Sequence, residues 1–272
     1  MMEINKQLAK LLQQQHGVDV SRYEKSFLDK ALRKRLDDNH CASLEEYCVC
    51  LEQNDQEAGK LLDSLKISYS EFFRNPLTFA VLEQIILPAL VLKKRKSKSK
   101  EIRVWSAACA AGQESYSLSM LLEELKTGGN EISYRIFATD QCEAQVNEVR
   151  NGYYPAEALN NLNFKRVKQW FTKRGDTYTV KPALKNYINF SVFDLFGEEL
   201  CCPPESLFGD FDLVVCANLL FYYKSEYRKN ILEKAVKCLA DGGYLITGET
   251  ERDILIRNNY REVFPKTAIF TI

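Results

Sequence analysis

The stretch 101-EIRVWSAACAAGQESYS-117 decides the fold. Its apolar first part predicts a short buried strand at residues 102–107, and the polar turn after Gly112 predicts the start of a helix near Ser115. A strand that runs through a loop of small residues into a helix is typical of sheets that hold a nucleotide-like ligand on that loop.

Beyond this stretch, short apolar strands alternate with helices. We expect strands at 102–107, 134–139, 188–192, 211–216, 244–247 and 268–272, and helices at 115–125, 143–150, 164–171 and 227–239. Apolar strands separated by helices predict an open, mostly parallel sheet of the α/β class, covered on both faces.

The first part of the chain has helical periodicity instead. Apolar positions recur at helical spacing up to residue 92, and Ser43 with Glu46 predicts a capping box. We therefore expect a small all-α domain at 1–92, a linker at 93–100 and an α/β domain at 101–272. The run 92-LKKRKSKSK-100 favours a solvated linker, with an anion-binding patch as the alternative.

Composition excludes several classes of protein. Acidic and basic residues balance at 37 each, which gives no overall field for nucleic acid or an anionic membrane. No apolar run approaches the roughly 20 residues of a membrane span, and no targeting segment is visible. The nine cysteines have no framework spacing, and only His16 and His40 are available as histidine ligands. We expect a cytoplasmic monomer with reduced thiols and without a metal site.

The glycine content of the first loop restricts the ligand. Between Ser106 and Ser117 the only glycine is Gly112, so the dinucleotide fingerprint and the Walker lysine are both missing. Asp140 ends the second expected strand, where an acid commonly accepts hydrogen bonds from ribose hydroxyls. Together these features favour S-adenosylmethionine, the alternative being a tight packing turn followed by a surface aspartate.

Several motifs in order carry a family resemblance. They read SYSEFFRNPLTF, IRVWSAACAAGQESYSLSMLL, IFATD, GYY, FDLVVCANLLFYY and DGGYLITGETE. From about residue 4 to about residue 252, the sequence resembles the CheR-type chemoreceptor methyltransferases. The resemblance implies an S-adenosylmethionine-dependent methyltransferase sheet with an all-α N-terminal domain and a short antiparallel insertion, here 170-WFTKRGDTYTVKPAL-184.

The resemblance also implies an activity and a site. The activity is methyl transfer from S-adenosylmethionine to glutamate side chains on the cytoplasmic helices of a receptor or another signalling protein. Arg74 and Tyr222 match catalytic positions. The matched cofactor-contacting residues are Ser68, Ser70, Arg74, Ala107, Glu114, Asp140, Asp194, Leu195 and Asn218. The basic stretch Arg33–Arg35 matches a helix that faces acidic receptor helices, with a solvated surface as the alternative.

The chemistry is compatible with these residues. A glutamate acceptor, with a pKa of about 4.3, is already ionised at neutral pH and needs no general base. Two departures keep other functions open: Ala217 stands where the family usually has arginine, and Asp194 where it more often has asparagine. Gln113 and Ser115 replace an acid and a proline of the family, a change that we expect to be tolerated because serine can open a helix. The alternatives are a non-catalytic, cofactor-binding regulatory or scaffold module and a methyltransferase for another acceptor.

Overall fold

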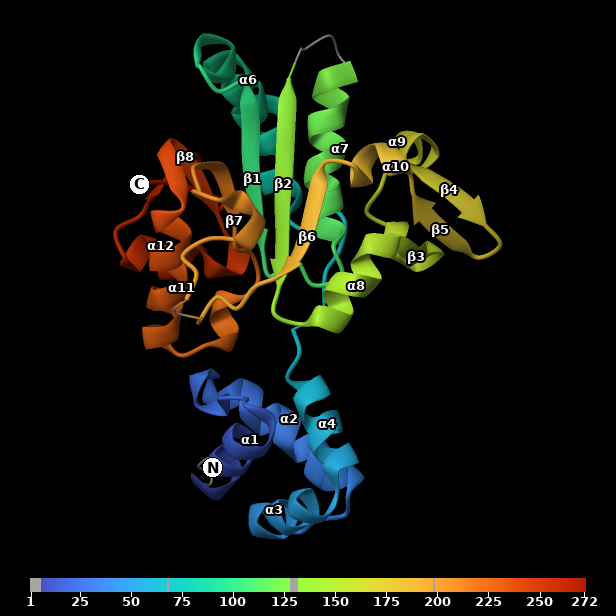
Figure 1. Ribbon diagram of the computed structural model, residues 1–272, viewed down its shortest axis with the longest axis vertical. Helices are drawn as coiled ribbons and strands as arrows, with labels where there is room; N and C mark the ends of the chain where they lie inside the picture. Colours follow the sequence, from blue (N-terminus) through green and yellow to red (C-terminus); the bar gives the residue numbers. More distant parts are fainter. Residues whose placement is uncertain (1–5, 68, 128–131, 198) are drawn as a thin grey trace. The chain divides into compact units, whose positions relative to one another are not determined.

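The computed structural model describes residues 6–67, 69–127, 132–197 and 199–272 (Figure 1). By its internal contacts the chain divides into two compact units. The first is drawn from residues up to Ile67 together with Phe221–Lys229, and the second contains Ser68–Leu220 and Asn230–Ile272. This differs from the boundary expected at residue 92.

The first unit is helical, as expected. It contains α1 (Lys6–His16), a short 3₁₀ turn (Val20–Arg22), α2 (Lys25–Asp38), α3 (Leu44–Gln53) and α4 (Asp55–Ser64). The Ser43 hydroxyl accepts the Glu46 backbone N–H at 3.2 Å, while the Glu46 carboxylate accepts the Ala42 N–H at 2.6 Å. The predicted cap is therefore confirmed, with the glutamate reaching one residue further back than in a standard capping box.

A late segment of the chain completes this unit. The ring of Tyr223 stacks on Tyr23 with centroids 5.1 Å apart, and the Tyr222 carbonyl accepts the Glu24 N–H at 2.8 Å. The Arg228 guanidinium also donates to the Glu24 carboxylate. These contacts join residues about 200 positions apart in sequence, which explains why residues 221–229 are assigned to the helical unit.

The second unit is built on a seven-stranded sheet within the described residues, in the order β6-β2-β1-β7-β8-β10-β9. The bounds are β1 Glu101–Ala107, β2 Ser133–Asp140, β6 Ile188–Val192, β7 Phe211–Val215, β8 Leu239–Ile246, β9 Arg261–Glu262 and β10 Ile269–Thr271. The pairs among β6, β2, β1, β7 and β8 are parallel, and β10 pairs antiparallel with both β8 and β9. The predicted α/β class is confirmed.

Alternating side chains of the strands fill a core on each face of the sheet. On one face Ile102 and Val104 join a cluster with the helices α7 (Gln113–Thr127) and α8 (Glu143–Asn151). On the other face Trp105 packs on Phe211 with ring centroids 5.7 Å apart. Successive side chains of a strand point to opposite faces, so both faces of the sheet are buried, as expected. After β7, the helix α11 (Ser225–Lys237) precedes β8, and the helix α12 (Arg252–Arg257) precedes β9.

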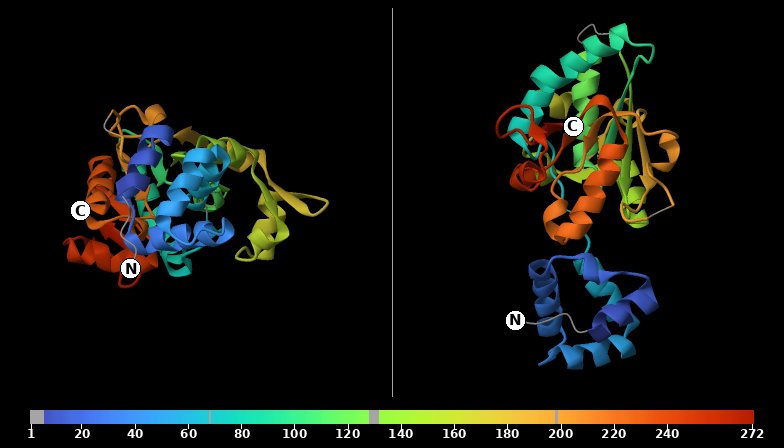
Figure 2. Two further views of the ribbon diagram at one scale, coloured as in Figure 1. Left: turned by 90° about the horizontal axis from the view of Figure 1, so that it is seen from below. Right: turned by 90° about the vertical axis from the view of Figure 1, so that its left-hand side faces the viewer.

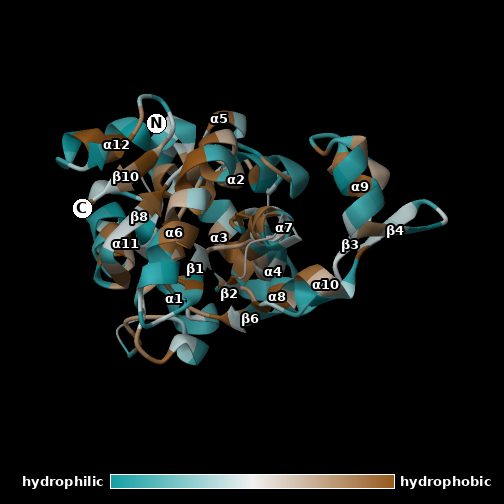
Figure 3. Ribbon diagram, turned by 90° about the horizontal axis from the view of Figure 1, so that it is seen from above, coloured by the Kyte–Doolittle hydropathy of each residue, from teal (hydrophilic) through white to brown (hydrophobic). Residues whose placement is uncertain are grey.

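A helical run at residues 76–96 explains why the boundary moved. It consists of α5 (Pro76–Val81), a π-helical turn (Leu82–Ile86) and α6 (Leu87–Lys96), so it includes the first part of the expected linker. By length and composition alone this run is apolar enough to cross a membrane, whereas no such run was expected from the sequence. Its apolar residues are part of the core of the second unit: Leu82, Ile86, Leu87, Leu90 and Val91. Figure 3 shows the apolar colouring along α6 and the strands beside it.

The expected antiparallel insertion is present. Strands β3 (Tyr153–Pro155), β4 (Phe171–Arg174) and β5 (Thr177–Val180) form a small sheet in the order β3-β5-β4, flanked by α9 (Phe164–Trp170) and α10 (Pro182–Lys185). The turn between β4 and β5 is Gly175–Asp176, as the sequence indicated. This hairpin extends away from α8 and the large sheet (Figure 2, left).

Candidate active site

The candidate cofactor residues of the second unit gather at one edge of the large sheet. Ala107 ends β1, Asp140 ends β2, and Asn218 follows β7. Because these strands are parallel, their carboxyl ends meet at the same edge, which is where open α/β sheets bind ligands.

The loop after β1 has a tightly wound backbone. Ala108 and Ala110 have φ angles of 58° and 47°, and Gly112 has 82°. A Cβ on Gly112 would stand 1.9 Å from the Cγ2 atom of Val149 in α8, so only glycine fits at this position. Two non-glycine residues in the left-handed region within one short loop are typical of a functional site.

Asp140 holds the loop after β1 against the loop that follows β2. Its carboxylate accepts the Ala110 N–H at 3.0 Å and the Cys142 N–H at 2.9 Å, and the residue is buried. Burial raises the pKa of Asp140 above its usual value, while the backbone donors act in the opposite direction. A carboxylate has about four acceptor positions, and the backbone N–H of Gln141 also contributes to its stabilisation, so the side chain keeps room for a hydroxyl donor.

Glu114 lies at the start of α7, beside Ala107. Its carboxylate accepts a hydrogen bond from Ser106 Oγ at 2.7 Å, and Ser106 Oγ in turn accepts from Ser115 Oγ at 3.0 Å. Burial raises the pKa of Glu114 to about 7, and the negative charge of Glu251 adds to the rise, whereas Ser106 and Arg74 lower it. The side chain is therefore poised to bind a cation, which would restore its full charge.

Arg74 stands on a segment that is pinned to α7. The preceding residue, Phe73, has φ 51° and donates its N–H to Ser117 Oγ at 3.1 Å. The Arg74 guanidinium lies over the Tyr69 ring, 4.9 Å from its centroid, and donates to the Tyr69 carbonyl at 3.3 Å. Ser70 is half-buried on the same segment, and Ser68 lies outside the described residues.

Glu251 is a site residue that sequence reasoning missed. Its buried carboxylate accepts the backbone N–H groups of Asn218 at 2.7 Å, Leu220 at 2.6 Å and Gly248 at 2.8 Å. It thereby ties the loop after β7 to the loop after β8, and it holds Asn218 in the left-handed region at φ 60°. Glu251 is the last residue of the GETE motif in the sequence, but the motif alone does not distinguish a buried carboxylate that joins two loops from an exposed one.

The remaining cofactor candidates follow β6. The exposed carboxylate of Asp194 accepts the Phe196 N–H at 2.9 Å, which closes a turn, and Leu195 is buried. Ala217, at the position of the expected arginine, is half-buried and packs against the core.

Two residues of the helical unit complete the predicted set. Tyr222 belongs to the first unit, where its ring meets Phe27 edge-on at 4.8 Å, so its catalytic role stays a prediction. Arg35, expected as part of a basic surface that faces the receptor, is not a free surface cation, because its guanidinium donates to both oxygens of Glu57 at 2.7 and 2.5 Å. Glu57 is fully buried, so this ion pair holds the helical unit together.

Comparisons with known proteins identify the family over most of the chain. The family model described as "CheR methyltransferase, SAM binding domain" matches residues 68–268, and "CheR methyltransferase, all-alpha domain" matches residues 6–65. A chemotaxis protein methyltransferase of Borreliella burgdorferi is 29% identical over 96% of this chain and 91% of its own length. Chemotaxis protein methyltransferase 1 of Pseudomonas aeruginosa is 28% identical over 91% and 89%, and the Escherichia coli protein of that function is 26% identical over 90% and 83%.

Proposed function

Since this chain belongs to the CheR methyltransferase family and is a methyltransferase that uses S-adenosylmethionine, we propose that it forms methyl esters on glutamate side chains of a chemoreceptor-like protein. The single observation that carries the proposal is the set of ionic groups gathered near the loop after β1, namely Glu114, Asp140 and Arg74. We place the reaction in the cytoplasm, where the helices of such receptors are found.

The donor and acceptor groups of the site fit the cofactor. Asp140 offers carboxylate lone pairs at the end of β2 for ribose hydroxyls. Glu114 offers a carboxylate for an ammonium group, and the guanidinium of Arg74 suits a carboxylate. The loop between them contains a single glycine and no lysine, which suits a ligand without phosphates. When bound, S-adenosylmethionine supplies a methyl group on a positively charged sulfur.

The protein's own contribution is to orient the reactants and to exclude water. An ionised acceptor carboxylate has its nucleophilic lone pair available, so alignment is the main requirement. Both histidines of the chain belong to the helical unit, and Glu114 is hydrogen-bonded to Ser106. A carboxylate acceptor therefore suits the site better than an amine, which would first have to lose a proton.

The receptor partner is expected to meet α2. Lys30, Arg33 and Lys34 are exposed at spacings of three and four residues, which places them on one face of this helix. We expect the double variant Arg33→Glu, Lys34→Glu to bind an acidic receptor fragment at least about tenfold more weakly at low salt, with unchanged cofactor affinity. The control is Lys60→Glu, an exposed change on α4. If the double variant binds the receptor fragment as tightly as the wild-type protein does, this face of α2 is not the partner surface.

The proposed reaction is tested by the stability of its product. Incubation with labelled S-adenosylmethionine and the cytoplasmic fragment of a receptor should give labelled fragment, and mild base should release the label as methanol. Label that survives base would indicate an amine acceptor. Cofactor binding without any incorporation of label would instead favour a non-catalytic, cofactor-binding module. That alternative is kept open because Ala217 stands where the family usually has an arginine.

A further inference from the structure

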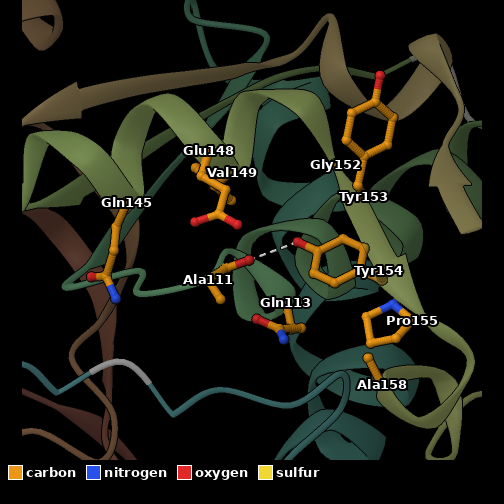
Figure 4. Close-up of a pocket in the computed structure, with 10 residues that line it drawn as sticks. All are labelled: Ala111, Gln113, Gln145, Glu148, Val149, Gly152, Tyr153, Tyr154, Pro155 and Ala158. Atoms are coloured by element: carbon orange, nitrogen blue, oxygen red, sulfur yellow. Dashed lines mark hydrogen bonds between the residues drawn. The ribbon is translucent and has the colours of Figure 1, made fainter. Parts of the chain in front are cut away.

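A pocket lies between the loop after β1, α8 and the small sheet (Figure 4). Its volume is about 360 Å³, near the lower end of ligand pockets, which suits one side chain or a small molecule. Its lining is Ala111, Gln113, Gln145, Glu148, Val149, Gly152, Tyr153, Tyr154, Pro155 and Ala158. None of these residues is among the cofactor or acceptor residues assigned above.

The walls of this pocket are apolar and firmly held. Val149 and Tyr154 are buried, and Pro155 and Ala158 continue the apolar surface. The Tyr154 hydroxyl donates to the Ala111 carbonyl at 2.7 Å, as Figure 4 shows, so the ring is fixed against the loop. Burial raises the pKa of Tyr154 well above its usual value, with nearby negative groups including Glu148 contributing, and the hydroxyl therefore stays a donor.

The polar groups of the pocket include one buried oxygen acceptor that lacks a donor. Gln113 is 8% exposed, and its Oε1 atom has no hydrogen-bond partner in the structure. Such an unsatisfied buried acceptor costs about 1–3 kcal/mol, which a ligand with an N–H group would recover. Glu148 and Gln145 extend from α8 toward the loop, and the Glu148 carboxylate points to the space beside Ala111 (Figure 4).

No cation offsets these acceptors within the lining. None of its ten residues is basic. The ammonium of Lys185, which lies close to Gly152, donates to the Asn151 carbonyl. Arg150, on the same helix as Glu148, donates to the Phe190 carbonyl and to Asn147. The pocket therefore combines an apolar wall, one carboxylate and an unpaired amide oxygen.

We propose that this pocket binds the guanidinium group of an arginine side chain on a partner polypeptide. A guanidinium carries five donors in a planar fork and can serve the Glu148 carboxylate and the Gln113 oxygen together, whereas an ammonium is a compact point charge. The aliphatic stem of arginine suits the wall of Val149 and Pro155.

The test uses capped tripeptides with arginine, citrulline or lysine at the centre and the whole chain without cofactor. Citrulline has nearly the shape of arginine but no charge. We expect saturation-transfer NMR to show binding of the arginine peptide at least about tenfold tighter than that of the citrulline peptide, with lysine between them.

Variants locate the binding. Glu148→Gln and Gln113→Met should each weaken the arginine peptide about fivefold to tenfold, because each removes an acceptor. The matched control Glu143→Gln removes the same charge from the exposed first turn of α8, outside the pocket, and should change nothing. Gln113 is the first residue of α7, so its substitution can also disturb the helix. Weaker binding in Gln113→Met therefore supports the proposal only if Glu148→Gln, which alters an exposed residue, weakens binding as well.

Three results would overturn the assignment. Equal binding of the arginine and citrulline peptides would show that the pocket does not recognise the positive charge. Unchanged affinity in Glu148→Gln would place the peptide elsewhere. Binding of free arginine but not of the capped peptide would exclude a polypeptide partner. Because no cofactor or methyl acceptor is present, each of these results leaves the methyl-transfer proposal untouched.

Discussion

At the residue scale, Gly112 sets how closely the loop after β1 approaches α8. We predict that Gly112→Ala lowers the free energy of unfolding by about 2–4 kcal/mol and abolishes cofactor binding, because the added Cβ would stand 1.9 Å from Val149 at a φ of 82°. Urea unfolding and calorimetry measure the two effects. The double variant Gly112→Ala, Val149→Ala should recover part of the stability, since it removes the clash but keeps the backbone strain. No recovery would show that the clash is not the cause.

Glu114 gives a prediction on pH at the same scale. Its pKa is raised to about 7, and a cofactor ammonium would favour the ionised form. Binding must then release a proton below pH 7, so affinity for S-adenosylmethionine should rise about tenfold between pH 6 and pH 8. Calorimetry at both pH values measures the change. Glu114→Gln should bind weakly and without this pH dependence, and a wild-type affinity equal at both pH values would contradict the assignment.

At the element scale, Glu251 joins the ends of β7 and β8. We predict that Glu251→Gln lowers the free energy of unfolding by about 2–4 kcal/mol, because an amide offers one oxygen to three backbone N–H groups and turns its own N–H₂ toward them. Thermal unfolding measures this change. Glu249→Gln, two residues earlier and exposed, is the control, and equal melting of the two variants would mean that the clasp carries no energy.

The ion pair between α2 and α4 gives a second prediction at this scale. Arg35→Met leaves the buried Glu57 carboxylate without its bidentate partner, so we expect a loss of about 3–5 kcal/mol in the unfolding of the helical unit. The double variant Arg35→Met, Glu57→Met should lose much less, because no buried charge remains. Lys34→Met, an exposed neighbour, is the control. A double variant as unstable as the single one would show that packing, and not the charge, is responsible.

The strands were predicted where apolar runs are continuous and were misjudged where they are not. β1 and β2 agree with their expected positions to within a residue, because each contains a pair of adjacent apolar residues, Val104–Trp105 and Ile136–Phe137, inside a short stretch bounded by polar residues. β8 starts at Leu239, five residues before the expected 244, because Asp241 and two glycines hide the strand from a hydrophobicity pattern. The pairing of Arg35 with Glu57 was invisible, since a distance of 22 positions has no local signature.

At the scale of the whole molecule, the sequence predicted two domains but not where the chain divides. Residues 76–96 read as part of the helical domain because helical periodicity does not say which core a helix packs against. Residues 221–229 contribute to the helical unit through Tyr223 and Arg228, which lie about 200 positions from their partners. Both features depend on tertiary contacts. Within the site, the loop around Gly112 and the acid Asp140 were indicated by the sequence pattern itself, whereas the other site residues came from the family resemblance.

The measurement that tests the account most directly is calorimetric titration of the whole chain with S-adenosylmethionine and S-adenosylhomocysteine. We predict micromolar binding of both and its loss in Asp140→Ala, while Asp176→Asn, an exposed acid in the turn between β4 and β5, binds normally. Circular dichroism must show that each variant is folded. Failure of the folded wild-type protein to bind either compound would contradict the cofactor site at the carboxyl edge of the sheet, and with it the proposed methyl transfer.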